Sequence, residues 1–219
     1  MERYFLGIII PAFNEEKTIE GVIHKSLKYG FPVVVNDGSS DNTFNIAKKA
    51  GAKVINHKFN KGYDEALNSG FEYLIKNKYK YLLTIDADNQ HDFNVIPQMI
   101  KKAEEGNDIV ITNRDQKQRF GELLFGSYTN LRWGIKDPLS GLKLYRKKSI
   151  HDINFNFESS VGTQILIEAL VTKKKVKEIK TKTNKRNDNS RFGITLNANL
   201  KIIKALIIAI KRDLMNFRN

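Results

Sequence analysis

The fold is decided by the stretch Tyr81-Leu82-Leu83-Thr84-Ile85-Asp86-Ala87-Asp88-Asn89-Gln90. Its first five residues carry no charge and end in two β-branched side chains, which is typical of a strand buried on both faces. Acidic and amide residues follow at once. The stretch therefore predicts a strand of a parallel sheet with polar chemistry at its carboxyl end, where ligands of such sheets bind.

Short apolar runs and helical patterns alternate on both sides of this stretch. Further strands are predicted at Leu6–Ile10, Val33–Asn36, Lys53–Ile55 and Ile109–Thr112, and helices at Lys17–Tyr29, Thr43–Ala50, Tyr63–Lys76 and Val95–Glu104. This alternation indicates an α/β fold with a mostly parallel sheet and helices on both faces.

The composition limits the class of protein. The chain has 219 residues, 41% of them hydrophobic, which is enough for one sizeable core. It has no cysteine, so disulfide scaffolds, zinc ribbons and thiol nucleophiles are excluded, and a metal must bind to oxygen or imidazole ligands. No stretch approaches the ~20 apolar residues of a membrane span, and the apolar run near the N-terminus is not a convincing signal peptide. We expect a cytoplasmic protein, soluble or peripheral on the cytoplasmic membrane face.

The positive charge lies mainly in the last third of the chain. The net charge of +13 divides into +5 over residues 1–150 and +8 over residues 151–219. Such an excess attracts nucleic acid, anionic lipid headgroups or phosphorylated substrates, or it is a solvated lysine-rich surface. The basic residues are not interleaved with aromatic residues in a nucleic-acid-binding pattern, so no specific nucleic-acid partner is expected.

We predict a main domain over residues 1–181, a flexible basic loop over 182–195 and an amphipathic helix over 196–219. The helix has apolar residues at alternating spacings of three and four, beside four basic residues. The apolar residues are Leu200, Ile203, Ile207, Ile210, Leu214 and Phe217, and the basic ones are Lys201, Lys204, Lys211 and Arg212. Such a helix lies in a membrane interface, or packs on the protein's own core or on a second subunit, and the sequence leaves these alternatives open.

Asp86 and Asp88 are two residues apart at a strand end, so their side chains can point the same way with Ala87 turned aside. Two close carboxylates repel each other unless a cation lies between them. Oxygen ligands of this kind suit Mg²⁺ or Mn²⁺, and Gln90 and His91 offer an additional oxygen and nitrogen. An Asp-x-Asp pair alone is weak evidence for a metal site, because chance and loop capping also produce it.

A second acidic cluster follows Val33–Asn36. Asp41 and Thr43 fit an ordinary helix cap, and the turn at Gly38 leads to a helix N-terminus that suits an anion. Capping does not explain Asp37 at the strand tip. Acidic clusters therefore converge on one edge of the predicted sheet.

Five motifs in series resemble the family-2 glycosyltransferases over roughly residues 6–195. The motifs are Ile8-Ile9-Ile10-Pro11-Ala12-Phe13-Asn14-Glu15-Glu16, Val33-Val34-Val35-Asn36-Asp37-Gly38-Ser39-Ser40-Asp41-Asn42-Thr43, Asn60-Lys61-Gly62, Asp86-Ala87-Asp88-Asn89-Gln90 and Asp137-Pro138-Leu139-Ser140-Gly141. Within that family, the fourth motif and the segment from Asp137 to Tyr145 are most similar to the dolichyl- or polyprenyl-phosphate mannose and glucose synthases.

The resemblance implies a Rossmann-like fold of the nucleotide-diphospho-sugar transferase A type, with residues 1–181 as the catalytic domain. It implies inverting, metal-dependent transfer of a hexose from GDP-mannose or UDP-glucose to a polyprenyl or dolichyl phosphate. Mg²⁺ or Mn²⁺ is the expected cofactor. The lipid would be reached through peripheral membrane contact of the tail, a membrane-protein partner or a homo-oligomer.

The resemblance also implies roles for individual residues. The nucleotide and diphosphate are expected to contact Pro11, Phe13, Glu15, Asp37, Asp86, Ala87 and Gln90, with Asp37 on the base. The metal is expected on Asp86, Asp88 and Gln90. The expected catalytic residues are Asp88, Arg114 and Asp137, and Ser140 and Gly141 are expected near the transferred sugar. Asp137 would be the general base if the acceptor is a hydroxyl group, whereas a lipid phosphate needs little deprotonation.

Three departures from the family pattern concern the base, the ribose and the acceptor. Asn36 replaces a frequent aspartate, Asp64 follows the Asn-x-Gly motif where small residues are common, and Leu142 stands where an aromatic residue is frequent. Two alternatives remain open: a transferase of the same fold acting on a glycan or another hydroxyl acceptor, and a non-catalytic nucleotide-sugar-binding protein.

Five arginines are candidate phosphate ligands because a guanidinium group matches phosphate oxygens. They are Arg114, Arg119, Arg132, Arg186 and Arg191, the last two within the family-like segment Arg186–Gly193. We expect Arg114→Ala to lower turnover far more than stability.

Overall fold

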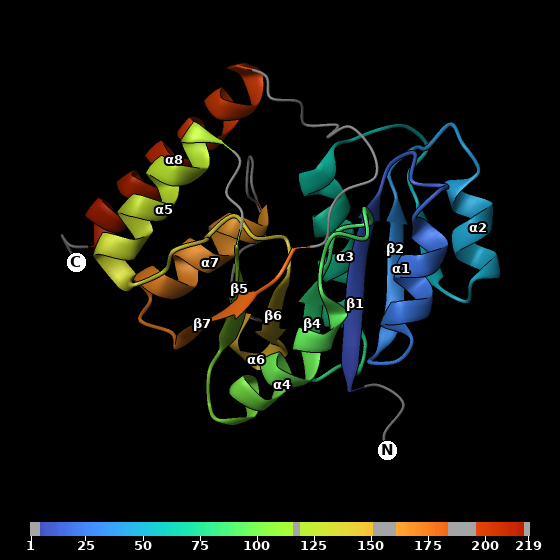
Figure 1. The fold of residues 1–219 in the computed structure, drawn as a ribbon, viewed down its shortest axis with the longest axis horizontal. Coiled ribbons are helices and arrows are strands. Elements are labelled where there is room, and N and C mark those ends of the chain that lie inside the picture. Colours follow the sequence, from blue (N-terminus) through green and yellow to red (C-terminus); the bar gives the residue numbers. More distant parts are fainter. Residues whose placement is uncertain (1–4, 116–118, 151–160, 184–195, 217–219) are drawn as a thin grey trace.

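Over residues 5–115, 119–150, 161–183 and 196–216, which the computed structural model describes, seven strands form one sheet with helices on both faces (Figure 1). The strands are β1 (Leu6–Ala12), β2 (Phe31–Asn36), β3 (Lys53–Asn56), β4 (Tyr81–Thr84), β5 (Ile109–Arg114), β6 (Lys143–Arg146) and β7 (Val176–Thr181). The helices are α1 (Ile19–Ser26), α2 (Thr43–Lys49), α3 (Tyr63–Lys76), η1 (Phe93–Val95, a 3-10 helix), α4 (Ile96–Glu104), α5 (Phe120–Trp133), α6 (Lys147–Ile150), α7 (Val161–Val171) and α8 (Leu196–Asn216).

The strand order is β3-β2-β1-β4-β6-β5-β7. Neighbouring strands are parallel except where β6 pairs with β4 and β5. The predicted α/β fold with a mostly parallel sheet is confirmed, and so are the five predicted strands, β1 to β5. The sequence patterns did not reveal β6 and β7.

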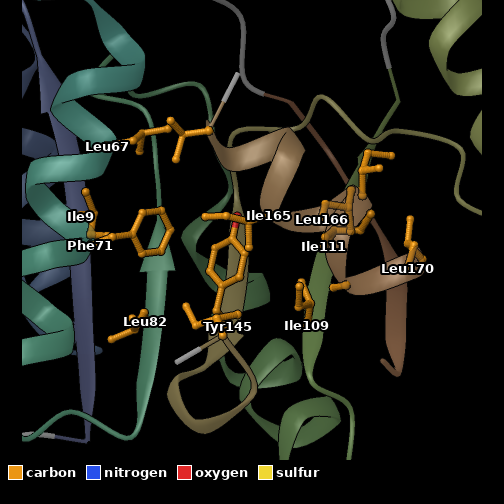
Figure 2. Packing of buried hydrophobic residues seen from close by; sticks show 14 of the residues in the cluster. Ile9, Leu67, Phe71, Leu82, Ile109, Ile111, Tyr145, Ile165, Leu166 and Leu170 are labelled. Carbon is orange, nitrogen blue, oxygen red and sulfur yellow. The ribbon is translucent and has the colours of Figure 1, made fainter. Parts of the chain in front are cut away.

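Alternate side chains of β1 enter two hydrophobic clusters, one on each face of the sheet. Ile9 packs in one cluster with Phe71 of α3 and Tyr145 of β6, whereas Ile8 and Ile10 lie in the other. The rings of Phe71 and Tyr145 meet edge to face with centroids 5.3 Å apart (Figure 2). Because both faces are covered, polar residues collect at the strand ends.

The C-terminal helix α8 packs on the protein through one of its faces. At one end of α5, the Gly121 amide donates to Asn199 Oδ1 (3.1 Å), and at the other end Arg132 Nε donates to Asp213 Oδ2 (2.9 Å). These two contacts show that α5 and α8 run parallel, as Figure 1 also shows. Arg212 pairs with Glu168 of α7 through two hydrogen bonds of 2.7 and 2.8 Å.

None of the described helices combines the length and the apolar content needed to cross a bilayer. The tail helix predicted over 196–219 is observed from Leu196 to Asn216, and Phe217 lies outside the described residues. The basic loop predicted over 182–195 lies outside them from residue 184 onward.

Candidate active site

The loops after β1 and β2 are tied together by hydrogen bonds from one loop to the other. The Asn14 amide donates to Ser39 Oγ (2.9 Å), and the Glu15 amide donates to Thr43 Oγ1 (2.7 Å). Asp41 Oδ1 accepts from the Thr43 amide at 3.0 Å, from the position before the N-cap residue Asn42, whose own side chain makes no capping hydrogen bond. The loops are therefore fixed relative to each other before any ligand binds.

Three residues expected at the nucleotide lie in β1 and in the loop after it, namely Pro11, Phe13 and Glu15. Pro11 is buried in β1, where it is paired with Val35, whereas Phe13 is 38% exposed at the strand end. Glu15 Oε2 accepts from the Thr18 hydroxyl at 2.7 Å. Their contacts with a nucleotide stay predictions.

Asp37 is buried and holds the Asn60–Gly62 turn. Its Oδ1 accepts from the Lys61 amide (2.9 Å), and its Oδ2 accepts from the Gly62 amide (2.7 Å). His57 Nδ1 lies 2.7 Å from Asp37 Oδ1, and the other ring nitrogen lies 2.9 Å from Ser69 Oγ. The carboxylate thus organises the turn that precedes α3, and its expected contact with the base stays a prediction.

Asp86, two residues after the end of β4, is contacted by the side chains of Tyr63 and His91 and by the loop before β6. Tyr63, the first residue of α3, donates its hydroxyl to Asp86 Oδ1 at 2.8 Å, and His91 Nε2 lies 2.9 Å from Oδ2. A Cβ atom at position 141 would overlap with the Asp86 carboxylate. Gly141 is therefore required sterically, because the loop before β6 passes directly against Asp86.

The pKa of Asp86 reflects this environment. Burial acts to raise it, but the hydrogen bond and electrostatic interaction with His91, the hydrogen bond from Tyr63 and the charge of Arg114 lower it to about 2. Asp86 retains 32% exposure of its side chain, so an ionised carboxylate reaches the surface of the site.

Asp88 and Gln90 continue the same loop and are both partly exposed. Asp88 Oδ1 accepts from the Gln90 amide at 3.1 Å, and Ala87 between the two aspartates is buried. In the described part of the chain, no group of three His, Asp or Glu side chains is placed so that it could hold a metal ion. The oxygen ligands fit Mg²⁺ or Mn²⁺, which typically bind through one or two carboxylates plus waters and substrate phosphates.

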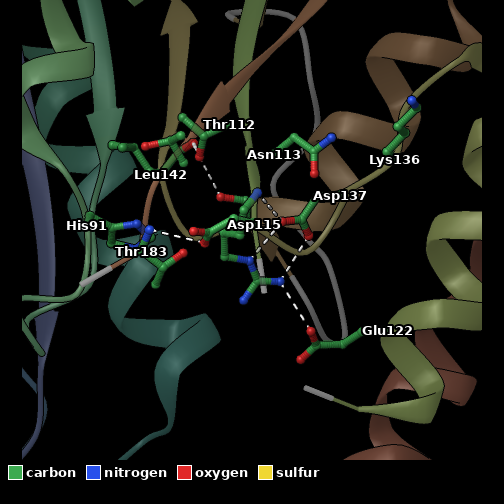
Figure 3. A network of polar contacts seen from close by, with 12 residues as sticks. His91, Thr112, Asn113, Asp115, Glu122, Lys136, Asp137, Leu142 and Thr183 are labelled. Carbon is green, nitrogen blue, oxygen red and sulfur yellow. Dashed lines mark hydrogen bonds and ion pairs between the residues drawn. The ribbon is translucent and has the colours of Figure 1, made fainter. Parts of the chain in front are cut away.

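Arg114, the last residue of β5, is held by two acidic side chains. Its Nε and Nη2 donate to Asp137 Oδ2 (2.8 Å) and Oδ1 (2.9 Å), and Nη2 also lies 3.3 Å from Glu122 Oε2. Figure 3 shows Asp137 and Glu122 in this network, with His91 on its other side. Burial acts to lower the pKa of Arg114, but the larger effect of Asp137, Glu122 and Asp86 raises it above its ordinary value. The guanidinium therefore stays charged.

Asp137 is 2% exposed and also anchored through its backbone. Glu178 of β7 accepts from the Lys136 amide (2.9 Å) and the Asp137 amide (2.8 Å). Burial raises the pKa of the Asp137 carboxyl, but hydrogen bonds and charge from Arg114 lower it below its ordinary value. A carboxylate held in this way positions Arg114 and is a poor proton acceptor, which argues against its expected role as a general base.

Ser140 and Lys143 form a buried polar cluster under the Asp137–Gly141 loop. Ser140 Oγ lies 2.7 Å from Thr112 Oγ1, and Lys143 Nζ donates to the Ser140 carbonyl. Burial lowers the pKa of Lys143 to about 8, although Asp137 and Asp86 act to raise it. Lys143 belongs to a motif that the sequence singled out, but its burial became evident only from the structure.

The other arginine candidates differ in position. Arg119 pairs with Glu122 at 3.6 Å, close to Arg114, whereas Arg132 binds Asp213 of α8. Arg132 thus contributes to helix packing at the far end of α5 from Arg119, and its candidate role as a phosphate ligand stays a prediction. Arg186 and Arg191 lie outside the described residues.

The three departures from the family pattern have structural roles. Asn36 Nδ2 donates to Asn56 Oδ1 at 2.6 Å, and Asp64 Oδ1 accepts from the Val161 amide at 2.9 Å at the start of α7. Leu142 is buried in the hydrophobic cluster that contains Ile8.

Comparison with known proteins agrees with this arrangement. The model of glycosyl transferase family 2 matches residues 7–157. The uncharacterized protein MJ1222 of Methanocaldococcus jannaschii is 32% identical over 220 residues, which cover 92% of this chain and 90% of that protein. A dolichyl-phosphate hexose transferase of Haloferax volcanii is 26% identical over 175 residues, which cover 74% of this chain and 75% of that protein.

A solved structure shares the fold. Glucosyl-3-phosphoglycerate synthase from Mycobacterium tuberculosis, in complex with Mn²⁺, uridine diphosphate and phosphoglyceric acid, superimposes with a TM-score of 0.76 at 21% identity. The superposition covers 96% of this chain and 78% of that one, which confirms the predicted A-type transferase fold. Together with the polar residues at the strand ends, these matches show that the chain belongs to glycosyl transferase family 2 and is a glycosyltransferase.

Proposed function

We propose that the enzyme transfers a hexose, with inversion, from GDP-mannose or UDP-glucose to a polyprenyl or dolichyl phosphate, in a reaction that needs Mg²⁺ or Mn²⁺. One observation carries the proposal. The ionised Asp86 and the fixed guanidinium of Arg114 converge at the carboxyl ends of β4 and β5, near enough for the charge of Arg114 to lower the pKa of Asp86. A cation site beside a phosphate-binding arginine suits a reaction between two phosphorylated substrates.

Asp86, Asp88 and Gln90 would hold the metal together with the donor diphosphate. A bound divalent cation would neutralise the charge that develops on the leaving diphosphate. Tyr63 and His91 keep the Asp86 carboxylate in place through hydrogen bonds of 2.8 and 2.9 Å, so the site is organised before the donor binds. The Mn²⁺ and uridine diphosphate in the structurally similar mycobacterial enzyme support this part of the proposal.

Arg114 would bind a phosphate at the same edge. Its Nε and Nη2 are directed to Asp137, while no described residue accepts a hydrogen bond from Nη1. Asp137 thus fixes the orientation of the guanidinium, which lowers the entropy lost when a phosphate binds.

The state of Asp137 favours a phosphate acceptor over a glycan or another hydroxyl group. A hydroxyl group must lose its proton during transfer, and the carboxylate expected to accept it is already bound to Arg114. A lipid phosphate is an anion near neutral pH and needs no such base. The name of the Haloferax volcanii relative, a dolichyl-phosphate hexose transferase, points to the same acceptor class. A lipid-linked acceptor would place the enzyme at the cytoplasmic face of a membrane, reached directly or through a membrane-protein partner or homo-oligomer.

The proposal is tested by incubating the protein with radiolabelled GDP-mannose or UDP-glucose, Mn²⁺ and a short-chain polyprenyl phosphate. Label from one donor is expected in the solvent-extractable lipid, and Asp88→Asn and Arg114→Gln are expected to lose at least ~100-fold in rate. Label in an oligosaccharide acceptor instead would favour the glycan alternative. Donor binding without transfer to any acceptor would favour a non-catalytic binding protein.

A further inference from the structure

One face of α5 is apolar although it is exposed. The exposed fractions of its apolar residues are 65% for Phe120, 51% for Leu123, 41% for Leu124 and 91% for Leu131. At 100° per residue these four side chains fall within an arc of about 100°, so they form one stripe along the helix. The opposite side of α5, which contains Phe125 and Thr129, is buried.

The apolar stripe of α8 is likewise not the side that packs on the protein. Leu200, Ile207 and Leu214 are exposed by 57%, 48% and 58%, and Ile203 and Ile210 are only partly buried. The buried side is formed instead by Ala205, Ala209 and Asp213. The centre of the stripe lies roughly 130° around the helix from this packed side.

The two stripes face the same direction. Viewed from the N-terminal ends of the two parallel helices, the stripe of α5 lies about a third of a turn anticlockwise from Gly121 and Arg132, which contact α8. The stripe of α8 lies about a quarter turn clockwise from Asn199 and Asp213, which contact α5. The direction from α5 to α8 is opposite to the direction from α8 to α5. An anticlockwise offset on α5 and a clockwise offset on α8 therefore point to the same side of the helix pair, and this is the side away from α7.

The resulting surface is called here the α5–α8 face. It consists of Phe120, Leu123, Leu124, Leu131, Leu200, Ile203, Ile207, Ile210 and Leu214.

Basic side chains border this face, and the acidic side chains of its two helices are turned inward. Lys201, Lys204 and Lys211 of α8 are exposed, whereas Glu122 and Asp213 are buried and paired with arginines. An apolar face with a basic border matches a bilayer that has anionic headgroups. A second copy of the same face would bring lysines against lysines, which disfavours a homodimer at this surface.

We propose that the α5–α8 face docks the enzyme on an anionic lipid bilayer, with α5 and α8 both lying in the interface. This inference rests on the proposed function, because only a lipid-linked acceptor requires the active site to lie at a bilayer. The first turn of α5 connects the α5–α8 face to the site, because Phe120 follows Arg119 and Glu122, two residues later, lies 3.3 Å from Arg114 Nη2. Docking there brings headgroup phosphates toward Arg114 while the lipid chains stay in the bilayer.

The test is flotation with vesicles of phosphatidylcholine containing 30 mol% phosphatidylglycerol, compared with phosphatidylcholine alone. The wild-type protein is expected to float with the anionic vesicles, and Leu131→Gln/Ile207→Gln is expected to lose at least about tenfold in partitioning. Lys204→Gln/Lys211→Gln is expected to reduce the preference for phosphatidylglycerol. Leu27→Gln is the matched control, because Leu27 is an apolar residue 46% exposed beside α1.

Equal flotation of the wild-type protein and Leu131→Gln/Ile207→Gln overturns the inference. So does self-association of the wild-type protein, measured by sedimentation, that the same variant abolishes. Transfer to a water-soluble, short-chain polyprenyl phosphate is measured in parallel without vesicles, and the wild-type protein and the variant are expected to be equal. Absence of transfer by both proteins counts against the proposed function, whereas the flotation result still decides the role of the face.

Discussion

The guanidinium group of Arg114 binds both carboxylate oxygens of Asp137, at 2.8 Å through Nε and 2.9 Å through Nη2. Because Asp137 is 2% exposed, Arg114→Ala leaves a buried carboxylate without its partner. We predict that this substitution lowers turnover by at least ~100-fold and also lowers the free energy of unfolding by about 3 kcal/mol. The two losses are thus expected to be comparable in free energy, which differs from the sequence-based expectation that turnover falls far more than stability.

The two effects are separable in the double variant Arg114→Ala/Asp137→Asn. Neutralising the carboxylate removes the unpaired charge, so chemical denaturation is expected to show about half of the lost stability restored. Turnover is expected to stay low, because the guanidinium is still absent. Recovery of activity together with stability would show that Arg114 acts only through folding.

Asp137 is predicted to make stability depend on pH. Burial raises its pKa, but the hydrogen bonds and charge of Arg114 lower it below the ordinary value of 3.8. A carboxyl whose folded-state pKa is lowered stabilises the fold fully above its unfolded pKa, and this contribution is lost as the pH falls through the folded pKa. The difference in unfolding free energy between the wild-type protein and Asp137→Asn should therefore be large at pH 6 and shrink below about pH 4. Urea denaturation at pH 6 and pH 3 measures it, and an unchanged difference would contradict the assignment.

Much of the fold was predictable because its signals are local. The apolar runs of β1 to β5 and the polar residues after them indicate a parallel sheet without knowledge of any contact. The position of β6 between β4 and β5 is not local, since it depends on antiparallel pairing with two strands formed earlier in the chain. The alternatives for α8 stayed open because periodicity identifies an apolar stripe but not what covers it.

The residues expected at the site are brought to one edge of the sheet, but their supporting partners were not foreseen. Tyr63 is 23 residues from Asp86, and Glu178 is 41 residues from Asp137. A single sequence gives no signal that pairs positions so far apart. Lys143 lies between the buried residues Leu142 and Leu144, but β6 was not predicted, so its burial became evident only from the structure.

Gly141→Ala is predicted to disable donor binding with little loss of fold. The added methyl group would overlap with the Asp86 carboxylate, so Asp86 must move away from Tyr63 and His91. We expect at least ~10-fold weaker metal-dependent donor binding, since misplaced ligands lower metal affinity. Isothermal titration with donor and Mn²⁺ measures this, with Gly21→Ala as the matched control because no atom lies within 4 Å of a Cβ there. Equal donor binding by wild type and Gly141→Ala would show that the position of Asp86 is unimportant.

Metal removal is predicted to abolish stabilisation by the donor. A ligand that binds only the folded state raises the melting temperature, and the proposed site completes the metal coordination with the donor diphosphate. GDP-mannose or UDP-glucose should therefore raise the melting temperature with Mn²⁺ and have little effect with EDTA. In Asp88→Ala the donor effect should disappear while the melting temperature without ligand stays within a few degrees of wild type. A shift that persists in EDTA would argue against metal-dependent donor binding.

Asp213→Ala is predicted to detach α8 from α5. Asp213 is 5% exposed, and its carboxylate accepts from the Tyr128 hydroxyl (2.8 Å) and from Arg132 Nε (2.9 Å). Burial and Asp213 together raise the pKa of Tyr128 to about 12, which reflects the same contact. Removing the carboxylate leaves two donors without their acceptor and is expected to cost about 2–3 kcal/mol.

The matched control is Leu214→Ala, because Leu214 is the next residue on α8 and is 58% exposed. Hydrogen exchange is the measurement, since it reports opening of α8 separately from unfolding of the sheet. Faster exchange in α8 and α5 is expected in Asp213→Ala, with exchange in β1 and β4 nearly unchanged. If the whole sheet exchanges faster to the same extent, α8 is an integral part of the core. In that case the prediction that residues 196–219 form a tail separate from the catalytic domain would be wrong.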